Sequence, residues 1–475
     1  MPNVLTSPPD STPQQVAAAA QAAGRAASAY AAVSASDRAR FLDRIAERLE
    51  GLGDKLLQAA NTETALPLAR LTGERGRTCA QLRMFAGLLR SDEWLDVRIE
   101  TADPNRQPLP KPDLRRTQVP LGAVGVFGAS NFPLAFSVAG GDTASALAAG
   151  CPVVFKAHPA HPETSRLAAE AILGAVSDCE MPEGTFGVVW GGPEVGRALV
   201  LDENIYAVGF TGSLRAGRAL FDLAASRDRP IPVYAEMGSV NPLFVMPGAL
   251  RERSQSMAEG YAGSLTLGVG QFCTNPGVVV GVAGSEFDTF VSGVAEKLRS
   301  SAAGTMLTQG IHDAYAAGVE ERRGDRRLTC HASGEGAAPS LFSVDASAFL
   351  SDPTLREELF GASAIAVRCS DLAEVRRVAD ALEGQLTATV HFDGSDVEDV
   401  RALMPSLVKM AGRIVANGYP TGVEVNTAQQ HGGPYPATTD SRATSVGTAA
   451  ILRFVRPVAF QDFPADLLPA ELRVG

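Results

Sequence analysis

Cys273 has the most distinctive chemical setting in this sequence. It stands in the segment Gly-Gln-Phe-Cys-Thr-Asn-Pro-Gly, residues 270–277, whose terminal glycines let the backbone turn sharply or approach a ligand closely. The apolar run at 278–280 predicts a buried strand directly after it. A thiol on such a loop has fixed geometry, which suits a nucleophile. A buried structural cysteine is the alternative, unless other segments supply a base, an oxyanion donor and a cofactor site.

Two further polar side chains have the chemistry that a nucleophilic thiol needs. Asn131 follows a predicted buried strand in Gly-Ala-Ser-Asn-Phe-Pro, where its amide either caps the turn or donates to a developing oxyanion. Glu236 stands in an apolar strand beside Gly238, and an isolated buried carboxylate is costly unless it is paired or functional. Burial is expected to raise its pKa towards the range of a general base.

A cofactor site is suggested by the turn after the predicted strand 205–210. Backbone N–H groups at a helix N-terminus, uncrowded at Gly212 and followed by Ser213, form a natural phosphate site. The spacing of Gly212 and Gly217 does not match G-x-G-x-x-G, so a plain tight turn remains the alternative. Lys156, at the end of another predicted strand, could reach ribose hydroxyls or a phosphate, or it is a solvated lysine.

The elements that would position these groups follow from the pattern of apolar residues and breakers. The expected order is strand 122–128, helix 142–149, strand 152–156, helix from 162, strand 186–190, helix 195–201, strand 205–210, helix 214–225, strand 233–238 and strand 242–246. This alternation predicts a parallel sheet covered on both faces. Helices are expected before it, at 14–33 and from 36 to about 89, and a second α/β unit after it. Residues 300–345 lack periodicity, so no elements are predicted there.

Two proline-containing segments are predicted to be extended. Residues 102–120 hold five prolines, which rule out a continuous helix. This polar segment has little core of its own, so we expect it to lie against another subunit. The C-terminal part, from residue 451, contains three more prolines and is predicted to be another extended piece that pairs with something.

The composition indicates a globular chain of two or three domains. It has 475 residues, of which 45% are hydrophobic and 20% charged. A net charge of −11 argues against a nucleic-acid partner. The six cysteines lie far apart without a CxxC pair, which favours a reducing compartment over a disulfide framework or a zinc site. Without a signal peptide or an apolar run of roughly 18 residues, the cytoplasm is expected and a membrane is not.

The catalytic candidates lie in segments that resemble motifs of the aldehyde dehydrogenase superfamily, in content and in order, over nearly the whole chain. Phe-Gly-Ala-Ser-Asn131-Phe-Pro resembles the family's oxyanion-asparagine turn. Ala-Glu236-Met-Gly238 resembles its general-base motif, and Gly-Gln-Phe-Cys273 its nucleophile motif. The resemblance therefore implies a catalytic thiol, base and oxyanion donor at these three positions.

The cofactor candidates resemble motifs of the same family. Val-Val-Phe-Lys156 resembles its ribose-binding lysine segment, and Phe-Thr-Gly212-Ser213 its pyrophosphate turn. Glu357-Glu358-Leu-Phe360-Gly resembles the second ribose clamp. With Gly238 beside the base, these residues are implied to bind NAD or NADP.

The resemblance implies an α/β fold with two domains and a small extended oligomerisation element. Residues 1–101 and 121–235 would form a Rossmann-type NAD(P)-binding domain, and residues 236–430 an α/β catalytic domain. The arm at 102–120 and the tail at 451–475 would form the oligomerisation element of a homodimer or homotetramer.

It also implies a mechanism. Cys273 would attack an aldehyde as thiolate, and since a free thiol has a pKa of about 8.5, the site must favour the anion. The Asn131 amide and the Cys273 N–H would hold the oxyanion, hydride transfer would leave a thioester, and Glu236 would activate the water that releases a carboxylate. A thioesterase-like hydrolase with the same thiol and base but no redox step is the rival enzyme class. A non-catalytic scaffold is opposed by the presence of all three groups.

The cofactor choice depends on a departure from the family pattern. Where NAD-preferring members commonly carry a glutamate that binds ribose hydroxyls and repels a 2′-phosphate, this chain has Pro159. His158 and Arg197 are possible phosphate partners. The sequence therefore favours NADP over NAD.

Residues 139–150, 156–162 and 420–442 resemble the branch that contains α-ketoglutaric semialdehyde (2,5-dioxovalerate) dehydrogenases and an NADP-linked fatty aldehyde dehydrogenase. The first activity, which yields 2-oxoglutarate, is expected. A fatty or general aliphatic aldehyde dehydrogenase is the alternative. That alternative requires an apolar tunnel, which is opposed by the polar residues Asn426, Gln429, Gln430 and His431.

The substrate site is expected to include residues close to the thiol and a group for the far carboxylate of the substrate. Phe272 and Thr274 flank the nucleophile, and Ser130 replaces a common tryptophan, which makes that wall smaller and more polar. His431 and Arg442 are the candidates for the far carboxylate. Arg442 could equally belong to a structural ion pair.

Overall fold

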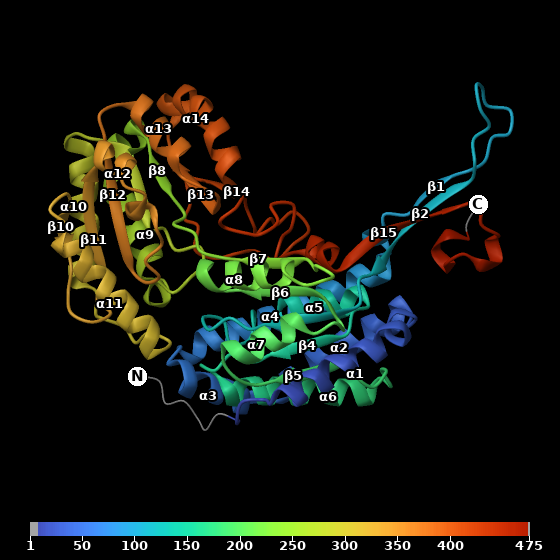
Figure 1. The fold of residues 1–475 in the computed structure, drawn as a ribbon. Helices are drawn as coiled ribbons and strands as arrows, with labels where there is room; N and C mark the ends of the chain where they lie inside the picture. The colour runs from blue at the N-terminus through green and yellow to red at the C-terminus, as the bar shows by residue number, and fades with distance from the viewer. Residues whose placement is uncertain (1–7, 474–475) are drawn as a thin grey trace.

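The computed structural model describes residues 8–473, which form two α/β lobes and a projecting arm (Figure 1). The strand order is β5-β4-β3-β6-β7 in the first lobe, β10-β11-β12-β9-β8-β13-β14 in the second and β1-β2-β15 in the arm. The predicted α/β class is confirmed. Among residues 8–473, no helix has the length and apolar character needed to cross a bilayer.

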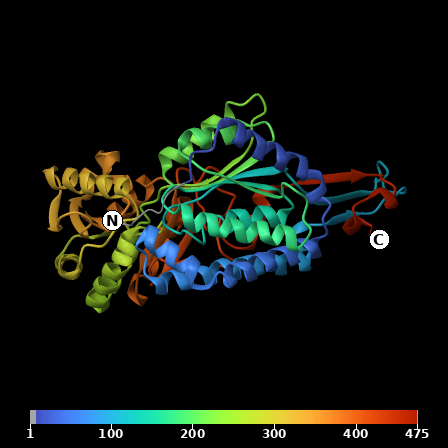
Figure 2. The same cartoon turned by 90° about the horizontal axis from the view of Figure 1, so that it is seen from below.

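The first lobe is a parallel sheet between two layers of helices (Figure 2). Its strands are β3 (Ala123–Phe127), β4 (Val153–Lys156), β5 (Phe186–Val189), β6 (Ile205–Thr211) and β7 (Val233–Glu236). Its helices are α1 (Pro13–Ala31), α2 (Ala35–Gly51), α3 (Gly53–Thr64), α4 (Leu68–Ser91), α5 (Gly141–Ala149), α6 (Pro162–Asp178), α7 (Pro193–Leu201) and α8 (Leu214–Ala225). Helices α1 and α7 pack together, whereas α2, α3 and α4 cover α5 and α6. The elements predicted here are confirmed to within a few residues.

The carboxyl ends of the first-lobe strands meet at one edge because the strands are parallel. In the register, Phe127 pairs with Lys156 and with Phe210, and Thr211 pairs with Glu236. The strands are apolar runs that are largely buried, as a sheet covered on both faces requires. The polar residues that end these strands are therefore gathered along one edge.

The second lobe is a mainly parallel sheet with its own helices. Its strands are β8 (Leu243–Val245), β9 (Val278–Val282), β10 (Thr329–Ala332), β11 (Ser340–Asp345), β12 (Ser363–Cys369), β13 (Gln385–His391) and β14 (Ala411–Ala416). Its helices are α9 (Pro247–Thr266), α10 (Ser285–Ser300), α11 (Gln309–Gly324), α12 (Ala346–Ser351), α13 (Leu372–Ala381) and α14 (Val397–Met410), with 3₁₀ turns η2 (Leu267–Gly270), η3 (Pro353–Arg356) and η4 (Gly394–Asp396). Residues 300–345, left unassigned by the sequence, hold α11, β10 and β11. Helix α11 buries only Tyr315 and Val319, so it carries no apolar stripe that periodicity could detect.

The arm projects on the side opposite to the second lobe (Figure 1). It consists of β1 (Arg98–Glu100), β2 (Leu114–Pro120) and β15 (Val455–Gln461), with β2 paired antiparallel to both neighbours. The two segments predicted to be extended thus pair with each other. The tail is only partly extended, because it also contains the 3₁₀ turns η5 (Thr448–Phe454), η6 (Ala465–Leu467) and η7 (Ala470–Leu472); η1 (Glu93–Leu95) precedes the arm.

Candidate active site

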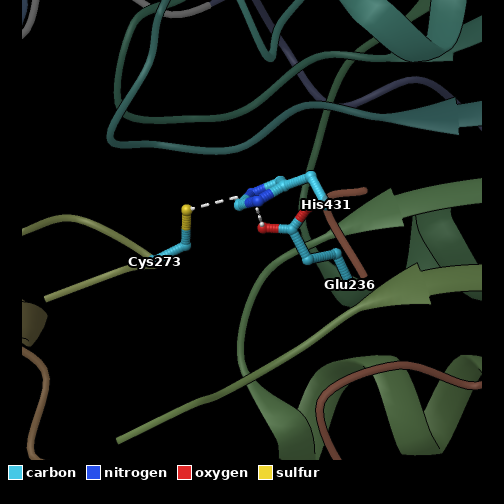
Figure 3. A group of neighbouring side chains, drawn as sticks. All are labelled: Glu236, Cys273 and His431. Atoms are coloured by element: carbon cyan, nitrogen blue, oxygen red, sulfur yellow. Dashed lines mark hydrogen bonds and ion pairs between the residues drawn. The ribbon is translucent and has the colours of Figure 1, made fainter. Parts of the chain in front are cut away.

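Three side chains from distant parts of the chain meet beside the edge of the first sheet. The Nε2 atom of His431 lies 3.4 Å from the Sγ atom of Cys273 and 3.1 Å from Oε1 of Glu236. Figure 3 shows the imidazole between the thiol and the carboxylate. One ligand-type atom from each residue lies within 4.8 Å of the other two. The structure therefore brings the predicted nucleophile and base together, and it places His431 between them.

The loop that carries Cys273 is shaped by glycine and by a buried asparagine. Gly270 has a φ of +68°, and a Cβ there would collide with the backbone of residues 361–362. The Nδ2 atom of Asn241 donates to the carbonyl oxygens of Cys273 at 2.9 Å and Ser239 at 3.1 Å. The side-chain oxygen of Gln385 accepts hydrogen bonds from the same Ser239–Asn241 segment. The nucleophile loop and the segment after Glu236 are thus tied together by buried polar side chains.

Glu236 ends strand β7 and is enclosed by the chain at 431–446. The backbone N–H of Met237 donates to the carbonyl of Ala437 at 2.7 Å, which lays this segment beside the strand. Ser445 Oγ donates to Oε2 of Glu236, and Ser445 is in turn bonded to the backbone carbonyl of His431. Glu236 is only 3% exposed, so these contacts replace its hydration.

The pKa values of the acid and the thiol are pushed in opposite directions. Burial raises the pKa of Glu236, but the neighbouring His431 and the hydrogen bonds from Ser445 and Cys273 outweigh it, so the pKa lies below its ordinary value. The predicted rise was wrong, because the sequence did not show which groups would surround this carboxylate. Burial and the Glu236 charge hold the pKa of the Cys273 thiol well above its ordinary value, although the Arg77 charge opposes them. The site therefore favours a charged carboxylate beside a protonated thiol, contrary to the expected anion.

Asn131 lies next to the nucleophile loop. Its Nδ2 atom donates to the carbonyl of Gln271 at 3.1 Å, and its own carbonyl accepts from Arg70 at 2.7 Å. The following turn is anchored by Glu74 of α4, whose Oε1 accepts the N–H groups of Leu134 and Ala135. Helix α4 therefore positions the turn in which the candidate oxyanion donor stands.

A cavity of about 1270 Å³ opens between the lobes beside these groups. It is lined by Cys273, Glu236 and Asn131, and by the predicted cofactor and substrate residues Ser130, Lys156, His158, Pro159, Gly212, Ser213, Glu358 and Phe360. Ser213 is the N-cap of α8, so free N–H groups face this end of the cavity. A Cβ at Gly238 would lie 2.6 Å from a carboxylate oxygen of Glu358, so glycine permits the close approach. The size, the helix N-terminus and the strand-end residues fit a dinucleotide.

Two cofactor candidates have shifted pKa values. Burial, assisted by the nearby Lys156 charge, lowers the pKa of His158 to about 4, so this ring is uncharged at neutral pH. It stacks on the ring of His161 at 5.6 Å. Burial raises the pKa of Glu358 to about 8. His158 can therefore offer a phosphate a hydrogen bond but not a full charge.

The structure places one of the expected substrate residues, Arg442, away from the site. The ring of Phe272 packs edge-on against Phe132 at 5.3 Å, and Thr274 is fully buried. Arg442 is not brought to the site: its side chain is 89% exposed and bonded to Asp440. This is the structural ion pair that the sequence left open, so Arg442 does not qualify as a ligand for the far carboxylate.

Several residues of the site were missed by sequence reasoning. They are Asn241, Gln385 and Ser445, which bond to the catalytic segments, and Arg70, Glu74 and Arg77 on α4. The first three carry no local signal. The last three are spaced by four and three residues, which places charged groups on one helix face and could have marked α4 as part of a site.

Comparisons with known proteins agree with this geometry. The sequence profile described as "Aldehyde dehydrogenase family" matches residues 2–445. Alpha-ketoglutaric semialdehyde dehydrogenase 2 of Azospirillum brasilense is 52% identical over 94% of this chain and 86% of its own length. Alpha-ketoglutaric semialdehyde dehydrogenase of Acinetobacter baylyi is 48% identical over 98% of this chain and 89% of its own length.

Solved structures share the fold at lower identity. A 1-pyrroline-5-carboxylate dehydrogenase superposes with a TM-score of 0.81 at 21% identity, covering 95% of this chain and 86% of that one. A gamma-glutamyl-gamma-aminobutyraldehyde dehydrogenase from Burkholderia cenocepacia gives a TM-score of 0.79 at 23% identity, covering 94% and 88%. These likenesses show that the two-lobed architecture with its arm is a known one.

Proposed function

The chain belongs to the aldehyde dehydrogenase family, and from this premise we propose that it oxidises α-ketoglutaric semialdehyde to 2-oxoglutarate with NADP as the preferred cofactor. That it is an NAD(P)-dependent enzyme acting on aldehydes follows from the family. The substrate is proposed because two relatives about half identical to this chain carry that name. The meeting of Cys273 and Glu236 at the cavity wall, with His431 between them, is the observation that carries the chemistry.

The first step requires a thiolate. Since the pKa of Cys273 is raised, we assign the proton to His431 Nε2, which lies 3.4 Å from the sulfur. The adjacent carboxylate of Glu236 raises the pKa of the thiol, but it also stabilises the imidazolium that forms. The sulfur then attacks the aldehyde carbon, while the oxygen receives hydrogen bonds from Asn131 Nδ2 and the Cys273 N–H.

The second step releases the product. A nicotinamide bound beside Cys273 would supply the hydride acceptor for the carbon attached to sulfur, and Cys273 would then carry the thioester. Glu236 removes a proton from water, the resulting oxygen nucleophile attacks the thioester, and the C–S bond breaks to give the carboxylate product. Ser445 and His431 hold the Glu236 carboxylate in place for this step.

The NADP preference is supported by the charges along the cavity. Pro159 provides no carboxylate to repel a 2′-phosphate, and the cations Arg197 and Arg215 line the cavity together with the carboxylates Glu194 and Asp222. Because the pKa of His158 is about 4, its ring is uncharged at neutral pH and can offer the phosphate only a hydrogen bond. Changing Arg197 or Arg215 to Met should weaken NADP binding more than NAD binding, as measured by titration calorimetry.

We propose that the residues assigned to cofactor binding from the family motifs act in two groups. Gly212 and Ser213 would hold the pyrophosphate at the N-terminus of α8, whereas Lys156 and Glu358 would hold ribose hydroxyls. Phe360 would support the second ribose. Gly238 keeps room for Glu358.

The test is steady-state formation of NADPH and NADH from a panel of aldehydes. We expect the highest kcat/KM for α-ketoglutaric semialdehyde with NADP, and lower values for aliphatic aldehydes of equal or greater chain length. A preference for long-chain aldehydes would favour the fatty aldehyde alternative. Hydrolysis of thioesters without formation of a reduced nicotinamide would indicate the rival hydrolase.

We also propose the domain division 1–101 and 121–235 for the cofactor, 236–430 for catalysis, and 102–120 with 451–475 for assembly into a homodimer or homotetramer. The arm supports the last assignment, because β15 is an edge strand and Leu452, Phe463 and Leu467 expose apolar surface near it. Light scattering would give the mass of this assembly in solution.

A cytoplasmic location is proposed because the six cysteines are unpaired within the described chain.

A further inference from the structure

Two arginines on one face of α4 border the aromatic wall next to the thiol. The guanidinium carbon of Arg70 lies 5.0 Å from the ring centre of Phe132 and 4.8 Å from that of Phe272. The corresponding atom of Arg77 lies 5.8 Å from Phe132 and 5.5 Å from Phe136. Phe272 precedes Cys273 in the chain, and the Phe136 ring lies 6.4 Å from that of His431. Both cations therefore stand behind the rings that surround the reacting groups.

These arginines keep buried N–H groups without partners. Within residues 8–473, Nε and Nη2 of Arg77 and Nη1 of Arg70 are buried and form no hydrogen bond. Buried donors without acceptors are costly, so their persistence points to an acceptor supplied by a ligand. Glu74 stands between the two arginines on the helix, but its Oε1 accepts the backbone N–H groups of Leu134 and Ala135, and its Oε2 is buried without a hydrogen bond to either arginine.

Arg77 interacts electrostatically with the reacting groups. Burial lowers the pKa of its guanidinium, and the neighbouring groups Cys273, Glu74, Glu236 and the exposed Glu424 oppose that shift. Of the two earlier candidates, His431 also has one buried nitrogen without a partner, Nδ1, but it lacks the paired donors of a guanidinium. The His431 Nε2 atom is shared by Cys273 and Glu236, and Arg442 is exposed and bonded to Asp440.

We propose that Arg77, assisted by Arg70, binds the carboxylate and 2-oxo oxygens at the end of the substrate that is remote from the aldehyde. This inference rests on the proposed function. The semialdehyde spans about 5–6 Å from aldehyde carbon to carboxylate when extended, as its few C–C bonds allow. Its two methylene groups would lie along Phe132 and Phe136 while the planar guanidinium forms paired hydrogen bonds with the 2-oxo acid.

A second role for Arg77 is separable by experiment. Its charge also opposes the rise in the pKa of the thiol, so its loss could slow every aldehyde equally. A group that binds the substrate carboxylate affects only substrates that carry one. The comparison of a charged and a neutral aldehyde of the same length therefore isolates the recognition effect.

The experiment measures kcat and KM for α-ketoglutaric semialdehyde and for pentanal in the full-length enzyme and in Arg77→Met. We expect kcat/KM for the semialdehyde to fall about 100-fold, mostly through KM, and that for pentanal to change less than about threefold. Arg77→Lys should restore part of the loss, and Arg70→Met should cost about tenfold. Arg90→Met is the matched control, because Arg90 lies on the same helix but pairs with the surface residue Asp43.

The outcomes are distinct. Equal losses for both aldehydes would overturn the inference in favour of a thiol effect, and no loss for either would overturn it outright. Cofactor binding and the unfolding temperature of each variant show whether it is folded. If the wild type fails to oxidise the semialdehyde, the proposed function fails instead. In that case 2-oxoglutarate should still inhibit pentanal oxidation by the wild type but not by Arg77→Met, and equal inhibition of both would reject the arginine site.

Discussion

The two sides of the catalytic thiol are built in different ways. On the cofactor side, Lys156, Ser213 and Glu236 each end a strand or begin a helix of one parallel sheet. On the other side, His431 and Ser445 come from an irregular C-terminal segment, and the arginines come from a long helix near the N-terminus. The cofactor side is therefore positioned by the local geometry of the sheet. The other side is positioned by the packing of segments that lie far apart in the sequence. We therefore expect the chemistry to depend on the second side as strongly as cofactor binding depends on the first.

The largest expected effect comes from Cys273→Ala, which removes the atom where both sides meet. Turnover should fall by at least about 10⁴-fold, since no other group can form the thioester. Cofactor affinity, measured by fluorescence titration, should stay within about twofold because the cavity residues remain. Residual dehydrogenase activity in this variant would contradict the assigned nucleophile.

The next effect concerns His431, which stands on the side of the thiol that is formed by distant segments. His431→Gln should lower kcat on the order of 100-fold, because the sulfur then loses the neutral acceptor for its proton and keeps only the Glu236 carboxylate, which raises the thiol pKa. Rapid-mixing measurements should show a slower first turnover, with the affinity for NADP unchanged. His331→Gln is the control, since His331 lies on β10, away from the cavity. A normal first turnover in His431→Gln would show that the thiol is activated by another group.

The same difference decides how much could be predicted from the sequence. The parallel sheet and its edge residues were predicted because each motif, such as Phe-Thr-Gly-Ser213, lies within one strand-turn-helix unit whose geometry is set locally. The position of His431 between Cys273 and Glu236 was not predicted, since it depends on a segment nearly 160 residues away from the thiol. The predicted rise in the pKa of Glu236 failed for the same reason: burial is readable from an apolar strand, but hydrogen-bond partners from residues 431–446 are not.

A smaller effect tests the charges on the two sides. Glu236→Gln removes one cause of the raised pKa of the thiol, so alkylation of Cys273 by iodoacetamide near pH 8 should become roughly three- to tenfold faster. In the wild type, the thiol pKa is raised well above 9.0, so the alkylation rate should still be rising with pH at pH 9.0. The rate is followed by mass spectrometry of the peptide that contains Cys273. A slower rate in Glu236→Gln would mean that the carboxylate promotes, rather than opposes, thiolate formation.

An effect of similar size belongs to the cofactor side and should be independent of the others. Glu358 has a pKa of about 8, raised by burial, so its neutral form dominates below that pH and its carboxylate above it. A carboxylate accepts hydrogen bonds from ribose hydroxyls better than the neutral acid does, so the affinity should fall as the pH drops through 8, by about tenfold between roughly pH 9 and pH 7. Titration with NAD as well as NADP excludes the 2′-phosphate, whose own second pKa is about 6, as the source of the change. The pH dependence should vanish in Glu358→Gln and persist in His431→Gln. If it persisted in Glu358→Gln, the ribose would not be held by this residue, and the cofactor side would also depend on groups that its local motifs do not show.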